Sequence, residues 1–146
     1  MSAVVAVSSA VVGALLATAA LVDAHERRLP NRLLAVALAC ALGGAALSVD
    51  GGVVLDALIG MTVGGGLLLC VRLTRGVGMG DVKMAAVVGA SVGASTTVLL
   101  AAPSAIAIAA FVAAIYGHIA NRRRVPLGPF LWLGWAATIV AAGVLS

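Results

Sequence analysis

The chain has 146 residues, of which 63% are hydrophobic and 10% are charged, and its mean hydropathy is +1.21. Soluble domains carry about 25% charged residues, so this composition excludes a soluble enzyme, a nucleic-acid-binding protein and a disordered tail. The net charge of +4 comes from nine Lys and Arg residues against five Asp and Glu residues. These basic residues are too few and too segregated to bind a polyanion, so we expect an integral membrane protein whose main contact is the lipid bilayer.

Six apolar stretches approach the length of about 20 residues that a helix needs to cross a bilayer. They cover residues 3–22, 33–49, 53–71, 84–100, 103–120 and 127–144. The sequence therefore predicts an all-α integral membrane protein, a single domain over residues 1–146 that forms a bundle of six transmembrane helices. No Lys or Arg precedes the first stretch, so we interpret it as a span and not as a secretory signal.

The boundary between the fourth and fifth spans stays open. Gly89, Gly93 and the run Ser95-Thr96-Thr97 can end a short fourth helix, and a long fifth helix kinked at Pro103 would then follow. Both versions contain six helices.

The basic residues all lie in or beside alternate connections. They are Arg27, Arg28 and Arg32 between spans one and two, Arg72, Arg75 and Lys83 between spans three and four, and Arg122, Arg123 and Arg124 between spans five and six. Cytoplasmic loops of membrane proteins collect Lys and Arg. We therefore expect these three connections to face the cytoplasm, both termini to lie outside, and the protein to reside in the cytoplasmic membrane.

Small residues spaced four apart predict close packing between helices. They form the pairs Gly60-x-x-x-Gly64 and Gly89-x-x-x-Gly93. We assign both pairs to packing within one bundle, with dimerisation as the alternative. The two cysteines, Cys40 and Cys70, lie inside apolar runs and form neither a disulfide framework nor a metal-binding pair, so we assign them to helix packing as well.

Acidic residues at the membrane are costly, which makes them candidates for function. Asp50 is expected in a short external loop, and Asp56 lies a turn into the third span, where a structural role is expected. Asp23 directly follows span one and Asp81 precedes span four. In the predicted topology both therefore lie at the cytoplasmic edge of the bilayer, although 58 residues separate them (81 − 23).

Two neighbouring carboxylates at one depth suit a particular chemistry. Two carboxylates a few ångströms apart cannot both stay ionised, because the charge of one strongly raises the pKa of the other, so the pair shares one proton at neutral pH. One carboxylate then takes a proton from water while the other gives one to a peptide carbonyl. This is aspartic proteolysis, which needs no metal and no cofactor.

The surroundings of Asp81 strengthen this hypothesis. The segment reads Gly76-Val77-Gly78-Met79-Gly80-Asp81-Val82-Lys83-Met84, with three glycines at alternate positions. Such glycines permit unusual backbone angles and close approach of another chain, as a site for an extended peptide requires. The alternative is a plain Gly-rich linker in which Asp81 caps the following helix.

Three motifs in chain order resemble those of type IV prepilin peptidases. Gly78 to Lys83 resembles the family's GxGD motif with its following Lys, and Asp23 with the later Pro30-Asn31 resembles the first aspartate and its Pro-Asn. The segment Leu127-Gly128-Pro129-Phe130 resembles the start of the family's last helix. The resemblance implies a peptidase that removes the short basic leader of type IV prepilin-like or pseudopilin substrates at the cytoplasmic membrane face.

The same resemblance implies the site residues. Asp23 and Asp81 are the expected catalytic pair, and the expected supporting residues are Gly78, Gly80, Lys83, Pro30, Asn31, Gly128 and Pro129. Lys83 is also read as a side chain that reaches the cytoplasmic headgroups, because it lies about 200° around a helix from Asp81. The segment with paired CxxC motifs that many members use for N-methylation has no counterpart here, so we expect the short, peptidase-only form.

Rival hypotheses remain at this stage. A metalloprotease would want His-Glu-x-x-His, but His25-Glu26 is followed by Leu29 where the second His should stand. His118 could join His25, Glu26 and Asp23 around a metal.

A serine protease would need Ser91 or Ser95 to have a base partner, and no His is expected at their depth. A non-enzymatic small transporter or pilus-assembly subunit is the remaining alternative. The oligomeric state, the scissile bond and the particular substrate stay open.

Overall fold

The computed structural model describes residues 2–26, 28–73, 78–95, 101–119 and 126–145, and in these segments it contains six α-helices. They are α1 (Ala3–Glu26), α2 (Asn31–Leu47), α3 (Gly51–Leu73), α4 (Met79–Ser95), α5 (Ala101–Ile119) and α6 (Gly128–Leu145). The prediction of an all-α chain with six helices is confirmed. All six predicted spans fall on these helices, with ends displaced by up to five residues.

The largest displacement concerns α4. The prediction of 84–100 is wrong at its start, because the helix begins five residues earlier, at Met79. Residues 96–100 lie outside the described part, and the described helix ends at Ser95, as in the alternative with a short fourth helix. Pro103 lies in the first turn of the described α5, where its missing N–H costs no helical hydrogen bond. The boundary between the fourth and fifth helices falls on residues 96–100, so the version with a kinked fifth helix stays untested.

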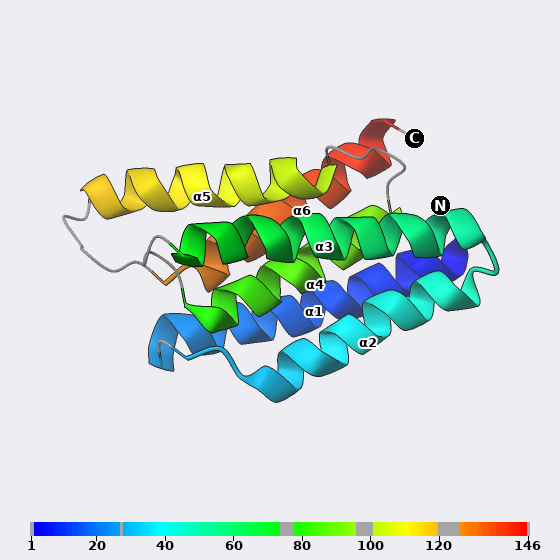
Figure 1. Cartoon of the computed structure of the whole chain (residues 1–146), viewed down its shortest axis with the longest axis horizontal. Coiled ribbons are helices and arrows are strands. Elements are labelled where there is room, and N and C mark those ends of the chain that lie inside the picture. The colour runs from blue at the N-terminus through cyan, green and yellow to red at the C-terminus, as the bar shows by residue number, and fades with distance from the viewer. Residues whose placement is uncertain (1, 27, 74–77, 96–100, 120–125, 146) are drawn as a thin grey trace.

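The helices run lengthwise along the molecule, and both termini lie at the same end as the turn between α2 and α3 (Figure 1). The opposite end gathers the last residues of α1, α3 and α5 and the first residues of α2, α4 and α6. Among the described residues this end carries Arg28, Arg32, Arg72 and Lys83, all of them exposed. The alternation of charge along the sequence therefore corresponds to one basic end of the bundle.

Helix α4 is the centre of the bundle, since it contacts each of the other five helices. Its buried residues are mostly Val, Ala and Gly, with Met84 the largest, and they cover every side of the helix. Small side chains let neighbouring helices approach closely in the absence of a strong hydrophobic driving force within lipid. Asp81 is therefore carried by the helix whose position the whole bundle determines.

Helices α3 and α4 approach each other closely through their glycines. A Cβ atom added at Gly60 would collide with the backbone carbonyl of Gly89, and one added at Gly93 would collide with the carbonyl of Asp56. At Gly64 it would meet the carbonyl of Ala85. The prediction that these glycines pack helices within one bundle is confirmed, because backbone lies against backbone at each of them.

Apolar side chains also cover the outside of the helices. Leu55, Leu58 and Leu67 of α3 are exposed, as are Val7 and Leu21 of α1. By length and composition, α1 and α3 are able to cross a membrane, while α2 and the described part of α6 are shorter apolar helices. An apolar exterior over this many helices is what a lipid environment favours.

The two cysteines differ in their surroundings. Cys40 is half-buried and packs against the main hydrophobic core, as predicted. Cys70 is exposed on α3, so its assignment to helix packing is wrong.

A pair of alanine substitutions on α3 tests the packing of α3 against α4. We expect Gly60→Ala to destabilise the fold by about 1–3 kcal/mol, because its Cβ cannot be accommodated without separating the two backbones. Gly66→Ala is the matched control, since a Cβ at Gly66 meets nothing within 4 Å. The control should be neutral or stabilising by up to about 1 kcal/mol through helix propensity. Denaturation of the purified protein in detergent measures both effects, and equal stability of the two variants would contradict the packing.

Candidate active site

Asp23 lies near the carboxyl end of α1 and is 6% exposed. Its Oδ2 atom accepts a hydrogen bond of 3.0 Å from the backbone N–H of Gly128, the first residue of α6. A Cβ atom at position 128 would lie 2.8 Å from the same oxygen, so glycine lets α6 begin close to the carboxylate without displacing it. Pro129 follows in the first turn of α6, where proline is well tolerated. The two sequence motifs of Asp23 and of Gly128-Pro129 therefore meet in space.

Asp81 lies in the first turn of α4 and is half-buried. Its Oδ2 atom accepts a hydrogen bond of 3.2 Å from the backbone N–H of Gly78, the residue before the helix. Asp81 is the third residue of α4 and Gly78 is the residue that caps it. The carboxylate therefore accepts from a backbone N–H group that has no partner within the helix. The expectation that Asp81 precedes the helix is thus wrong, and so is the alternative in which it is the capping residue itself.

The electrostatic environment of Asp81 favours its protonated form. Asp81 precedes the apolar part of α4, which begins at Met84. Burial raises the pKa of Asp81 from the ordinary value of 3.8 to about 6, the Gly78 N–H opposes this shift, and the negative charge of Asp23 raises the pKa further. An effect of one carboxylate on another requires that the two groups lie near each other. The helices α1 and α4 therefore bring two aspartates that are distant in sequence near enough for the charge of Asp23 to raise the pKa of Asp81.

Gly78 and Gly80 have ordinary backbone angles, and Gly80 allows a close contact with another segment of the chain. Neither Gly78 nor Gly80 has a positive φ, so the expectation of unusual angles is wrong for both. A Cβ atom at Gly80 would lie 3.0 Å from the Cβ of Leu29, in the connection between α1 and α2. Gly80 thus lets that connection pass directly over the start of α4, while Gly76 lies outside the described residues.

Lys83 and Asn31 connect two further motifs. The Nζ atom of Lys83 donates a hydrogen bond of 3.0 Å to Oδ1 of Asn31, the first residue of α2. Pro30 precedes it with φ −73° and ψ 110°, an extended conformation that directs the chain into α2. Both side chains of the pair are exposed. Lys83 therefore joins α4 to the Pro-Asn motif, a contact that the sequence did not predict.

The remaining acidic residues lie elsewhere. Asp50 is exposed and caps α3, since its Oδ1 atom accepts a hydrogen bond of 2.9 Å from the N–H of Gly52. Asp56 is half-buried in the second turn of α3, at the other end of the bundle from Asp81. Glu26 is exposed at the last residue of α1.

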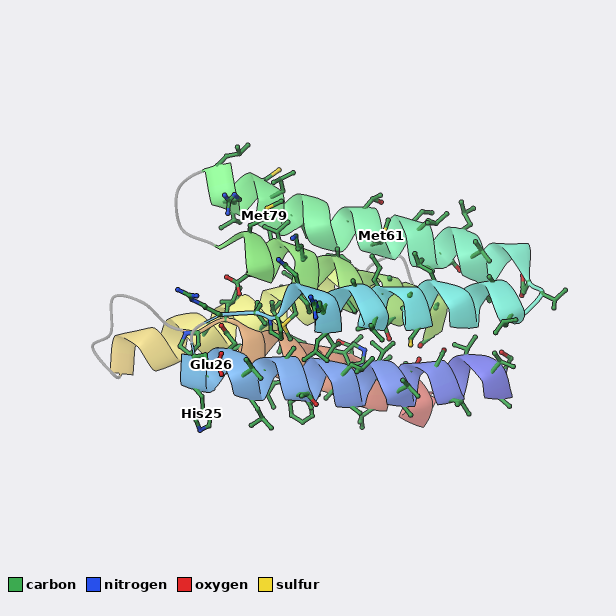
Figure 2. All side chains as sticks on the ribbon, turned by 90° about the horizontal axis from the view of Figure 1, so that it is seen from below. His25, Glu26, Met61 and Met79 are labelled. Atoms are coloured by element: carbon green, nitrogen blue, oxygen red, sulfur yellow. The ribbon has the colours of Figure 1, made fainter. Side chains whose placement is uncertain are left out.

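The residues of the rival metal site do not come together in the described part of the chain. His25 and Glu26 lie at the end of α1, and the His25 ring points away from the bundle (Figure 2). Met79, the first residue of α4, lies at the same end of the bundle, whereas Met61 lies midway along α3. Nδ1 of His25 is 3.0 Å from the carbonyl oxygen of Leu21 in its own helix. Within the described segments no three His, Cys, Asp or Glu side chains form a possible metal site, and the His118 side chain lies outside them.

Two tryptophans of α6 make contacts that sequence reasoning missed. The indole N–H of Trp132 donates to the carbonyl of Gly13 at 3.1 Å, and that of Trp135 donates to Oγ of Ser91 at 3.1 Å. A second hydroxyl, that of Ser95, shares a hydrogen bond of 2.7 Å with Ser9. The available signal was the presence of tryptophan N–H groups and serines in helices otherwise made of apolar residues, since such groups require partners when buried.

Removal of the Asp23 charge tests the coupling of the two aspartates. In Asp23→Asn we expect the pKa of Asp81 to fall below its value of about 6, because the negative charge that raises it is gone. A pH titration of the Asp81 carboxyl carbon by NMR measures the shift. Asp50→Asn, at the far end of the bundle, is the control and should leave the titration unchanged. An identical Asp81 titration in Asp23→Asn would show that the two carboxylates are not coupled.

A double-mutant cycle tests the contact between Lys83 and Asn31. We expect Lys83→Met and Asn31→Ala each to destabilise the protein by about 0.5–1 kcal/mol, the range for an exposed charged pair or hydrogen bond. The double variant should lose little more than either single variant, because both remove the same contact. Thermal or chemical unfolding measures the three changes, and strict additivity would contradict a direct contact.

Comparison with known proteins adds an independent finding. The model of the type IV leader peptidase family matches residues 10–118, which is most of the chain and includes Asp23, Pro30-Asn31 and the segment from Gly78 to Lys83. Helix α6 lies outside the matched part. No curated protein matches the chain, and no solved structure does either. With its motifs gathered at one end of a helical bundle, the chain belongs to the type IV leader peptidase family, whose members are membrane peptidases that act on prepilin-like substrates.

Proposed function

We propose that the chain is an aspartic endopeptidase in which Asp23 and Asp81 form the catalytic pair. The carrying observation is that α1 and α4 bring these two carboxylates to one end of the bundle, where the charge of Asp23 raises the pKa of Asp81. Membership of the family supports a peptidase, and the environment of the two acids supports the aspartic type. Each carboxylate has a backbone N–H that holds one of its oxygens, from Gly128 and from Gly78.

The proposed chemistry uses one proton shared by the pair. The ionised carboxylate accepts a proton from a water molecule, whose oxygen attacks the carbonyl carbon of the scissile peptide bond. The protonated carboxyl gives its proton to the carbonyl oxygen. When the tetrahedral intermediate collapses, the C–N bond breaks and the carboxyl that took the proton from water passes it to the leaving nitrogen. The other carboxylate takes a proton from a hydroxyl of the intermediate, so the pair again shares one proton. The N–H groups of Gly128 and Gly78 keep the two carboxylates oriented through these steps.

We propose further that all six helices span the cytoplasmic membrane, with both termini outside. Two observations support this topology. All nine Lys and Arg residues lie in or beside three alternate connections, and the helix ends that flank those connections form one end of the bundle. The site would then lie at the cytoplasmic edge of the bilayer.

The proposed substrate is a prepilin-like or pseudopilin protein with a short basic leader before an apolar helix. A site at the cytoplasmic edge would meet such a substrate where its leader leaves the membrane. The apolar outer faces of the helices offer the substrate helix a lipid-embedded approach. Removal of the leader at this junction agrees with both the depth of the carboxylates and the family.

Asparagine substitutions test the catalytic pair. We expect Asp23→Asn and Asp81→Asn each to lower leader cleavage by about 10²–10⁴-fold, because Asn keeps the hydrogen bond from Gly128 or Gly78 but cannot transfer a proton. The double variant should be about as inactive as either single variant, since the two residues act as a unit. The measurement is leader removal from a co-expressed prepilin, followed by mass spectrometry.

Matched controls accompany these variants. Glu26→Gln, three residues after Asp23, and Asp56→Asn, at the opposite end of the bundle, should retain most of the activity. A metal chelator should have no effect on cleavage. Activity that survives in Asp81→Asn, or that disappears in Asp56→Asn with normal folding, would identify different carboxylates as the catalytic ones.

A further inference from the structure

Helix α6 contacts both of the helices that carry the proposed catalytic aspartates. At its start, Gly128 donates to the Asp23 carboxylate on α1. One turn later, Trp132 donates to the carbonyl of Gly13, also on α1. Trp135 donates to Oγ of Ser91 on α4. The helix therefore makes hydrogen bonds to α1 and to α4 along one continuous stretch of eight residues (128 to 135).

The Trp135 indole lies between α1 and α4. Its ring is 8% exposed and packs against Gly13 so closely that a Cβ atom there would collide with it. On its other side its N–H reaches Ser91, which is 1% exposed. A buried indole N–H that loses its acceptor is destabilising, and so is a collision with the ring, so Trp135 has little freedom to move relative to either helix.

The contacts of Trp135 lie at equal distances from the two aspartates. Gly13 precedes Asp23 by ten residues on α1, and Ser91 follows Asp81 by ten residues on α4. At 1.5 Å per residue, each contact is about 15 Å along its helix from the carboxylate. A displacement of one helix along the other would break the contact at Trp135 and would equally change the relative height of the carboxylates.

We propose that Trp135 is a positioning residue that, together with Ser91 and Gly13, sets the axial register of α1 and α4 and thereby the relative placement of Asp23 and Asp81. The inference rests on the proposed function in so far as the two aspartates act as a pair. It assigns a role in the reaction to α6, which lies outside the segment matched by the family. Gly128, at the start of the same helix, holds the Asp23 carboxylate directly through a hydrogen bond. Trp135 holds α1 and α4 against each other farther from the aspartates.

The first test measures register without any activity. Nitroxide labels are attached to cysteines introduced by Glu26→Cys and Met79→Cys, two exposed positions at the ends of α1 and α4, in a background with Cys40→Ala and Cys70→Ala. Pulsed electron paramagnetic resonance gives the distribution of distances between the labels. We expect a narrow distribution in the parent and a shifted or broadened one in Ser91→Ala. An unchanged distribution in Ser91→Ala would overturn the proposal, whether or not the protein proves to be a protease.

The second test measures catalysis on the full-length protein. Ser91→Ala should lower kcat for leader cleavage by about 10- to 100-fold, the usual cost of a small misplacement of reacting groups, while KM stays within about twofold. A purely structural role would instead lower the melting temperature and leave kcat per folded molecule unchanged, and that result would overturn the proposal.

Two further variants complete the design. Trp135→Phe keeps an aromatic ring but removes the N–H, so it replaces Ser91→Ala if that variant does not fold, with the same expected results. The control is Thr138→Val on the same helix, because the Thr138 hydroxyl donates to the Gly134 carbonyl one turn earlier, at 2.9 Å, and makes no hydrogen bond to α1 or α4 among the described residues. It should change neither the label distances nor kcat, and an equal loss in Thr138→Val would show that Trp135 has no special role.

Discussion

A carboxylate that is 6% exposed among apolar helices needs a hydrogen-bond donor, and the rest of the site depends on how Asp23 obtains one. The donor is the first backbone N–H of α6, a group that a helix start leaves without an internal partner. A Cβ atom at position 128 would come within 2.8 Å of the carboxylate oxygen, so any larger residue there would displace the Asp23 side chain. One interaction thereby satisfies both a buried acid and a helix terminus, and it fixes where α6 begins relative to α1.

The central position of α4 has a similar consequence for Asp81. A helix that touches all five others cannot carry large side chains on every face, so α4 is built from Gly, Ala and Val against the glycines of α3. Such contacts are rigid because backbone meets backbone, and a small displacement meets a steep repulsion. The aspartate at the first turn of this helix is consequently held by the packing of the whole bundle and not by its own loop alone.

Two clusters of polar groups in the described bundle have different roles. The cluster at the basic end contains the two aspartates, their backbone donors and the pair Lys83 and Asn31. The other, formed by Ser9, Ser91, Ser95 and the two indoles, lies deeper among the helices. The first cluster contains two carboxylates, of which Asp81 is half-buried beside the exposed Lys83 and Asn31, whereas the second consists of neutral groups that satisfy one another. The deeper serines therefore join helices through hydrogen bonds and have no base that would make them nucleophiles among the groups of their cluster.

The sequence alone predicted the helix count and the family, which are confirmed, because apolar length and short motifs are local properties. The membrane class and the choice of Asp23 and Asp81 come from the same local patterns and stay predictions. The sequence could not determine that Asp81 lies inside α4, since the helix start depends on the hydrogen bond from Gly78 and on the passage of Leu29 over Gly80. The bond from Lys83 to Asn31 and the place of Trp135 between Gly13 and Ser91 were equally invisible. Each joins residues 44 or more positions apart, and no pattern in a single sequence encodes such a pairing. Only the packing of six helices against one another decided which polar groups would meet.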